Sequence, residues 1–148
     1  MDDRGVSRVL GYSLTITIST ILVAGLLIAG GNFVDDQRSD VVRSEMEVVG
    51  QRIAADIGAA DRLVRLGSGH SSVQIDSHVP ERIAGTRYDV RVRASDGNAT
   101  LVLSSGALDQ TIEVPVSNTT AVKPSRATGG DIVITYDRSN GHLEVTNE

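Results

Sequence analysis

A long uncharged segment constrains this chain more than any other feature. No charged side chain occurs from Val9 to Val34, and the segment is rich in Leu, Ile, Val, Thr and Gly. At ~1.5 Å per residue, about 26 residues in an α-helix span roughly 39 Å. The hydrocarbon core of a bilayer is only about 30 Å thick. The segment therefore predicts a membrane-crossing helix with the rest of the chain attached to it as a domain.

The charges at the two ends of this segment predict its orientation. Arg4 and Arg8 precede it, whereas Asp35, Asp36 and Asp40 follow it. Basic residues favour the cytoplasmic side of a membrane, and acidic residues contribute little to that preference. We therefore expect a single-pass protein of the cell membrane, with a cytoplasmic N-terminus and an external C-terminal domain.

Three processing fates fit such a segment. A secretory signal peptide has an apolar region of about 7–15 residues and a small-residue cleavage site. The run here is longer, although Ala24-Gly25 and Ala29-Gly30 offer small residues. A permanent transmembrane anchor is the second interpretation. The third is cleavage before the apolar run, which keeps the apolar helix in the mature protein.

The third interpretation comes from a resemblance at the N-terminus. Residues 4–11 read Arg-Gly-Val-Ser-Arg-Val-Leu-Gly and lead into a Thr/Ile/Val/Leu-rich run. This sequence resembles the N-terminus of haloarchaeal type IV pilins, in which a prepilin peptidase removes a short charged leader (a class III signal peptide). The resemblance implies a leader over residues 1–5, with Arg4, Gly5 and Val6 at the cleavage site and the cut between Gly5 and Val6.

The match to the family motif Val-Ser-Pro-Val-Ile-Gly is incomplete. Val6, Ser7, Val9 and Gly11 agree, Leu10 replaces Ile, and Arg8 replaces Pro. This pattern favours a divergent or minor pilin. The resemblance implies a transmembrane and assembly helix over 6–34 and an extracellular filament. It also implies as partners the prepilin peptidase, other pilin subunits, the membrane and, indirectly, an assembly ATPase and platform protein. The alternative is a membrane-anchored extracellular β-domain binding module that does not polymerise.

Residues 35–67 continue with helical periodicity. Apolar residues recur every three or four positions, which marks one face of an amphipathic helix. These residues are Val42, Met46, Val49, Ile53, Ile57, Ala60 and Val64. No proline precedes Pro80, so a continuous helix from Val9 to Leu66 is allowed; a bend or an end at Gly30-Gly31 is the alternative. The stripe requires a partner, either this chain's own sheet or neighbouring helices.

Residues 70–148 predict an extracellular β domain. Apolar and polar residues alternate over 87–94, 111–116 and 132–136, as in half-buried strands. Asp96-Gly97 and Asn140-Gly141 are hairpin signals, the second typical of a type I′ turn. Residues 117–130 read as an irregular connection. We expect an α+β fold: a long N-terminal helix followed by about six antiparallel strands in a small sandwich or barrel.

The chain carries little recognisable chemistry. It has no cysteine, its three histidines show no metal-ligand spacing, and it has no nucleophile, phosphate-loop or dinucleotide motif. We therefore expect neither an enzyme, a cofactor nor a metal. A net charge of −5 and four aromatic residues argue against nucleic acid. Asn98 and Asn118 begin N-x-Thr glycosylation motifs in predicted loops.

Two features of the charge distribution allow alternatives. Lys123 is the only lysine, and Asp outnumbers Glu about two to one. That balance is typical of proteins that stay soluble in high salt, although a GC-rich genome also favours arginine. Arg87, Arg91 and Arg93 share one face of a predicted strand. This face can bind an anionic partner or simply face solvent.

Overall fold

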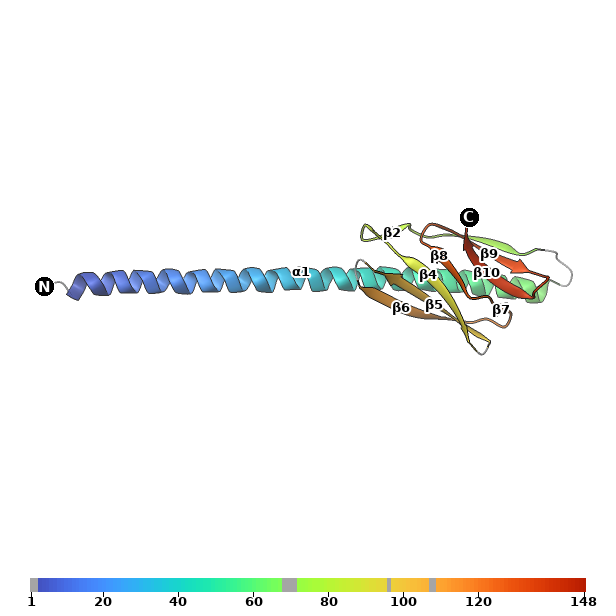
Figure 1. Ribbon diagram of the computed structural model, residues 1–148, viewed down its shortest axis with the longest axis horizontal. Coiled ribbons are helices and arrows are strands. Elements are labelled where there is room, and N and C mark those ends of the chain that lie inside the picture. Colours follow the sequence, from blue (N-terminus) through green and yellow to red (C-terminus); the bar gives the residue numbers. More distant parts are fainter. Residues whose placement is uncertain (1–2, 68–71, 96, 107–108) are drawn as a thin grey trace. The chain divides into compact units, whose positions relative to one another are not determined.

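The predicted α+β fold is confirmed. The computed structural model describes residues 3–67, 72–95, 97–106 and 109–148, with side chains from residue 10 onward. One long helix, α1 (Asp3–Leu66), precedes a β domain (Figure 1). The chain divides into two compact units, Met1–Arg38 and Ser39–Glu148. The division falls after Arg38, a few residues beyond the expected boundary at 34/35.

Helix α1 continues through Gly30 and Gly31 without a break. Each glycine costs about 1 kcal/mol relative to alanine in a helix interior, and the helix nevertheless runs through both. The threonines of the uncharged segment bond within the helix: the hydroxyls of Thr15, Thr17 and Thr20 each donate to the carbonyl four residues earlier, at 2.9 Å. At the other end, the Gly67 amide donates to the Leu63 carbonyl at 2.9 Å and closes the last turn.

The described part of the β domain contains ten strands, more than the six expected. They are β1 (Gln74–His78), β2 (Arg82–Ile83), β3 (Thr86–Arg87), β4 (Asp89–Ser95), β5 (Asn98–Ser105), β6 (Gln110–Val116), β7 (Ala121–Val122), β8 (Ser125–Thr128), β9 (Asp131–Asp137) and β10 (His142–Asn147). The expectation of an irregular connection over 117–130 was wrong, because this segment contains β7 and β8. Such short strands carry no period-two signal long enough to recognise.

The strands form two open four-stranded sheets and a short ribbon. The first sheet has the order β1-β9-β10-β7, the second β6-β5-β4-β8, and β2 pairs with β3 alone. The strands do not close into a barrel. The strand pairs are antiparallel, as predicted, with the exception of β10 and β7, which pair in parallel.

The two predicted hairpins differ in outcome. Strands β4 and β5 are joined tightly, since Ser95 pairs with Asn98 and Gly97 has a φ of 82°; Asp96 lies outside the described residues. At Asn140-Gly141 the type I′ prediction was wrong, because Asp137 pairs with His142 and leaves a longer loop. The Asp137 carboxylate accepts the Ser139 amide at 2.8 Å and the Asn140 side chain at 2.6 Å. An acidic side chain thus organises the turn.

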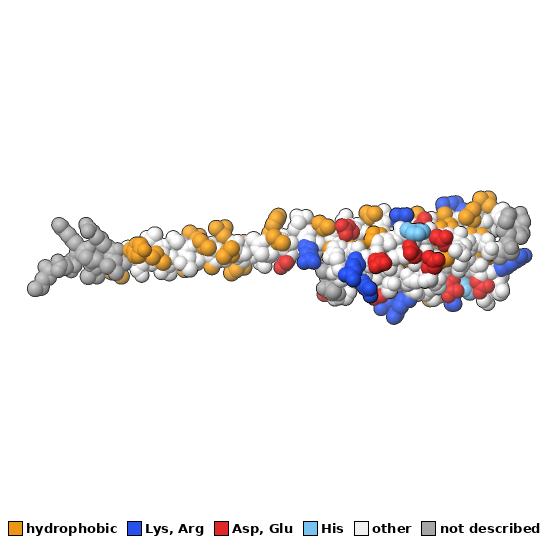
Figure 2. Space-filling model, turned by 90° about the horizontal axis from the view of Figure 1, so that it is seen from above, with side chains coloured by type: hydrophobic (Ala, Val, Ile, Leu, Met, Phe, Trp, Pro, Cys, Tyr) orange, Lys and Arg blue, Asp and Glu red, His pale blue; other side chains and the backbone are white. Residues whose placement is uncertain are grey.

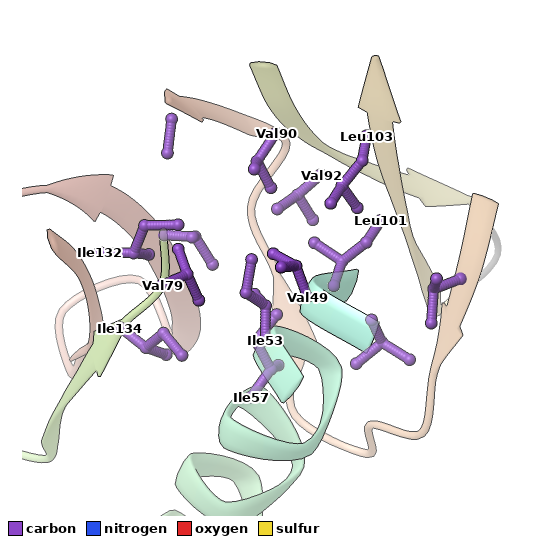
Figure 3. Close-up of a cluster of buried hydrophobic side chains, with 14 of the residues drawn as sticks. Val49, Ile53, Ile57, Val79, Val90, Val92, Leu101, Leu103, Ile132 and Ile134 are labelled. Carbon is purple, nitrogen blue, oxygen red and sulfur yellow. The ribbon is translucent and has the colours of Figure 1, made fainter. Parts of the chain in front are cut away.

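The core of the unit Ser39–Glu148 is built around α1. Val49, Ile53 and Ile57 point between the two sheets (Figure 3). Ile132 and Ile134 of β9 lie on one side of them, and side chains of β4 and β5 lie on the other. The helix therefore fills the space between the sheets.

Candidate functional site

The described residues contain no group of three or more His, Cys, Asp or Glu side chains placed to hold a metal ion. The candidate functional feature is instead helix α1, which includes a segment long and apolar enough to cross a membrane. Its large apolar side chains from Leu10 to Val34 are exposed, for example Ile21 at 66% and Leu26 at 72%. Hydrophobic side chains are visible along it in Figure 2.

The predicted stripe of α1 behaves differently. Six of its residues are buried: Val42, Met46, Val49, Ile53, Ile57 and Ala60. Val64, the last, is partly buried against the same cluster. Of the two partners the sequence allowed, the chain's own β domain covers this stripe. Another face of the same helix leaves Val41 and Val48 exposed, at 45% and 65%.

Gly50 lets the helix approach the second sheet closely. A Cβ added at this position would lie 2.8 Å from Val114 Cγ2 and 3.1 Å from Leu103 Cδ1. Both distances are shorter than ordinary carbon–carbon contacts of about 3.5–4.0 Å. Gly58, two turns later, leaves more room, since its nearest contact would be 3.6 Å. Gly50 therefore sets how tightly α1 packs on β5 and β6.

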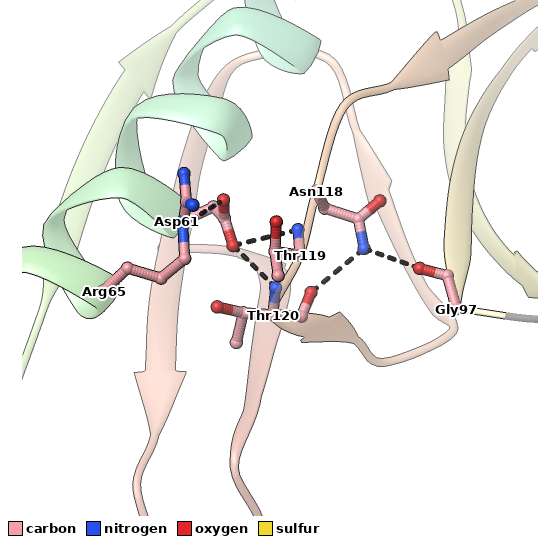
Figure 4. A network of polar contacts seen from close by, with 6 residues as sticks. All are labelled: Asp61, Arg65, Gly97, Asn118, Thr119 and Thr120. Atoms are coloured by element: carbon pink, nitrogen blue, oxygen red, sulfur yellow. Dashed lines mark hydrogen bonds and ion pairs between the residues drawn. The ribbon is translucent and has the colours of Figure 1, made fainter.

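A polar network fixes the last turns of α1 to the segment between β6 and β7 (Figure 4). The buried Asp61 carboxylate accepts the backbone amides of Thr119 and Thr120 at 3.2 and 2.6 Å. Its other oxygen lies 3.1 Å from Arg65 Nε. Burial acts to raise the pKa of Asp61, but the hydrogen bonds from Thr120 and Thr119 and the Arg65 charge outweigh it, so the net pKa is lowered. The carboxylate is thus held ionised.

A second polar contact ties α1 to the first sheet. The Ser77 hydroxyl of β1 donates to Asp56 Oδ2 at 2.6 Å, and Ser77 is 2% exposed. Together, Asp56 and Asp61 place one carboxylate of the helix against each side of the β domain. A hydrogen bond to a carboxylate is stronger than one between two neutral groups, so the buried Ser77 hydroxyl has a strong acceptor.

The two glycosylation candidates occupy different settings. Asn118 uses both ends of its amide: Oδ1 accepts the Ala99 amide at 3.0 Å, and Nδ2 donates to the carbonyls of Gly97 and Thr120 at 3.0 Å each. A glycan on Nδ2 replaces one N–H and would remove one of these bonds. Asn98 is exposed but is the first residue of β5. Its expected position in a loop was therefore wrong.

The proposed leader-cleavage residues Arg4, Gly5 and Val6 fall within the bounds of α1; their side chains lie outside the described residues. Asp61 and Arg65 are four residues apart, a spacing that by itself indicates an ion pair on a helix, but the sequence gives no sign of the Thr119 and Thr120 partners. No local pattern marks a contact across 58 and 59 residues. Gly50 was missed too, although a glycine within a strong helical pattern is itself a signal of close packing.

These features define a class of protein: a small α+β domain whose core helix extends N-terminally as an exposed apolar helix. The chain belongs to a family of unknown function, DUF7266, whose model matches residues 1–148. No curated protein and no solved structure matches it.

Proposed function

We propose that this protein is the structural subunit of an archaeal type IV pilus-like surface filament. The apolar helix holds the precursor in the membrane, with its N-terminus cytoplasmic and its β domain outside. Prepilin peptidase removes residues 1–5, and the helices of many copies then pack together. The protein has no catalytic role in this proposal.

The observation that carries the proposal is the length of α1 and the contrast along it. Residues 10–34 expose large apolar side chains on every face, and an exposed apolar surface of this extent requires a covering partner. A bilayer can cover it before assembly, and neighbouring helices can cover it afterwards. The threonine hydroxyls are compatible with both a bilayer and neighbouring helices. They already donate hydrogen bonds within α1, and small hydroxyl residues permit close approach of helices.

The β domain supports a structural role as well. Its core is filled by α1, and its polar networks bond helix to sheet. Asp61 and Asp56, the two inward carboxylates of α1, are both engaged by backbone or hydroxyl donors. They therefore serve the attachment of helix to domain. Subunits of a filament need this attachment to transmit force between helix and domain.

Cleavage of the leader tests the proposal. When the full chain is co-expressed with a prepilin peptidase, we expect the product to begin at Val6, by intact mass. Gly5→Leu should block cleavage and abolish filaments in the sheared fraction. Gly25→Leu is the matched control for cleavage, because a Cβ added at Gly25 would lie within 4 Å of no described residue and the position is far from the site in sequence.

The alternative makes the opposite prediction. A permanently anchored binding module keeps its N-terminal residues, tolerates Gly5→Leu without change and gives no filaments. An intact leader in the presence of an active peptidase would therefore overturn the proposed function.

A further inference from the structure

The outer face of the second sheet carries unpaired positive charge. We define the basic face by its charged residues: Arg91, Arg93 and Arg126, with Asp89 and Glu113. They lie on β4, β8 and β6 and alternate with the core residues of those strands. Only Arg93 has an ion-pair partner among the described residues, Glu113 at 3.0 Å.

Arg91 and Arg126 form an unfavourable arrangement within one molecule. They are directly opposite each other in the antiparallel β4–β8 pair, where like charges destabilise a sheet. Among the described residues, the buried Nε atom of Arg91 has no hydrogen-bond partner, and its burial keeps it out of reach of an outside group. The opposed side chains of Arg91 and Arg126 nevertheless favour an acceptor of negative charge from outside the molecule, which would offset their repulsion.

The outer face of the first sheet has the opposite charge. We define the acidic face by Asp76, Asp131, Asp137 and Glu144, which lie on β1, β9 and β10. Asp131 lies 3.5 Å from His78 Nε2, and Glu144 lies 2.9 Å from Lys123 Nζ. Lys123 is the only lysine of the chain, so carboxylates outnumber permanent cations on this face. Figure 2 shows acidic side chains gathered beside a histidine on the visible side of the β domain.

We propose that the basic face of one copy docks on the acidic face of a second copy. Carboxylates are the acceptors that guanidinium groups bind best, often through two bonds at once. The two faces belong to different sheets that share one core, so one molecule can use both. A contact between two different faces is heterologous, and where the rotation between subunits does not close a ring it extends into an open chain. The inference deepens the proposed function by naming the contact between β domains.

A second copy fits the basic face better than a free anion. A small anion can bridge Arg91 and Arg126 but makes no use of the surplus negative charge of the acidic face. Docking of copies uses both faces, and complementary charge orients the partners before contact. A chain of net charge −5 otherwise repels its own copies, so a local basic face is the means by which they approach.

Reciprocal charge reversal tests this contact, using the full chain in detergent micelles at low salt. The first variant combines Arg91→Glu with Arg126→Glu, and the second combines Asp131→Lys with Glu144→Lys. Each variant alone carries two faces of the same sign. We expect each to lose at least tenfold in β-domain association, and an equimolar mixture of the two to regain it. Arg43→Glu with Arg62→Glu, two exposed positions on α1, is the control for net charge.

Cysteine cross-linking reads out this association, because the natural chain contains no cysteine. Arg126→Cys mixed with Glu144→Cys should give a disulfide-linked dimer under mild oxidation, whereas Arg126→Cys mixed with Arg62→Cys should not. Equal yields of disulfide-linked dimer from the two mixtures would contradict the proposed contact. So would failure of the reversed variants to complement each other while their circular dichroism stays native. Leader cleavage does not depend on these faces, so its persistence in the variants separates this inference from the proposed function.

Discussion

The two ends of helix α1 use apolar residues in opposite ways. Over residues 10–38 the apolar side chains surround the helix and are exposed, whereas in Ser39–Glu148 a single stripe of the helix is buried. A helix that is apolar all round needs a lipid or protein environment on every side. A helix with one stripe needs one partner, and here the two sheets provide it. The comparison shows how one helix can form the core of a folded domain and also present an apolar surface outside it.

Truncation of Ile53 should have the largest effect. Ile53 is fully buried between the sheets, and replacing a buried Ile by Ala costs about 2–5 kcal/mol. We expect Ile53→Ala to lower the free energy of unfolding of the β domain by about that amount, measured by chemical denaturation in micelles. Ile21→Ala, at an exposed position of the other half, should leave it within about 0.5 kcal/mol. Equal losses would contradict the comparison.

Asp61 should make the attachment of α1 sensitive to acid. Its pKa is lowered in the folded state, so the folded protein binds the proton less tightly than the unfolded chain. The carboxylate therefore adds stability above the ordinary carboxyl pKa and loses it as the pH falls toward and below that value. Asp61→Asn should cost roughly 1–3 kcal/mol at neutral pH and flatten the loss of stability in acid.

Thermal melts from pH 7 to pH 3 measure this effect. Asp40→Asn, an exposed position on the same helix, controls for the loss of one negative charge. If the melting temperature of Asp61→Asn falls with pH as steeply as that of the wild type, another group is responsible for the loss of stability in acid.

Two glycines of α1 should respond in opposite directions. Gly50→Ala forces a methyl group against Val114 and Leu103, and overpacking of about 1–3 kcal/mol exceeds the gain in helix propensity of about 1 kcal/mol. Gly58→Ala meets only ordinary contacts and should stabilise the domain by up to about 1 kcal/mol. Paired denaturation curves check the difference in sign. Stabilisation by both substitutions would mean that the helix packs less tightly than described.

The exposed valines of the second half should have the smallest effect on stability. Val48 is 65% exposed, and surface substitutions usually change stability by less than about 0.5 kcal/mol. We expect Val48→Ser to leave the unfolding curve unchanged. Val49→Ser, at the adjacent buried position, is the matched control and should destabilise clearly. A large effect of Val48→Ser would show that this face is also part of the core.

The sequence was sufficient for the elements with long, regular patterns. The apolar run is long enough to cross a membrane, and the stripe from Val42 to Val64 has helical period over many turns, so α1 was predictable to its end at Leu66. The two-residue strands were not, because β2, β3 and β7 are too short to show a period. The contacts of Asp61 with Thr119 and Thr120 are fixed by the fold alone. The same holds for Arg126, which only sheet pairing places opposite Arg91.

The N-terminal residue of the mature protein tests the proposed function most directly. Intact-mass measurement on material sheared from the surface of the native host reports that residue. The account predicts a polypeptide that begins at Val6 and lacks residues 1–5. Cell-surface protein that retains the first five residues, with no product beginning at Val6, would contradict it.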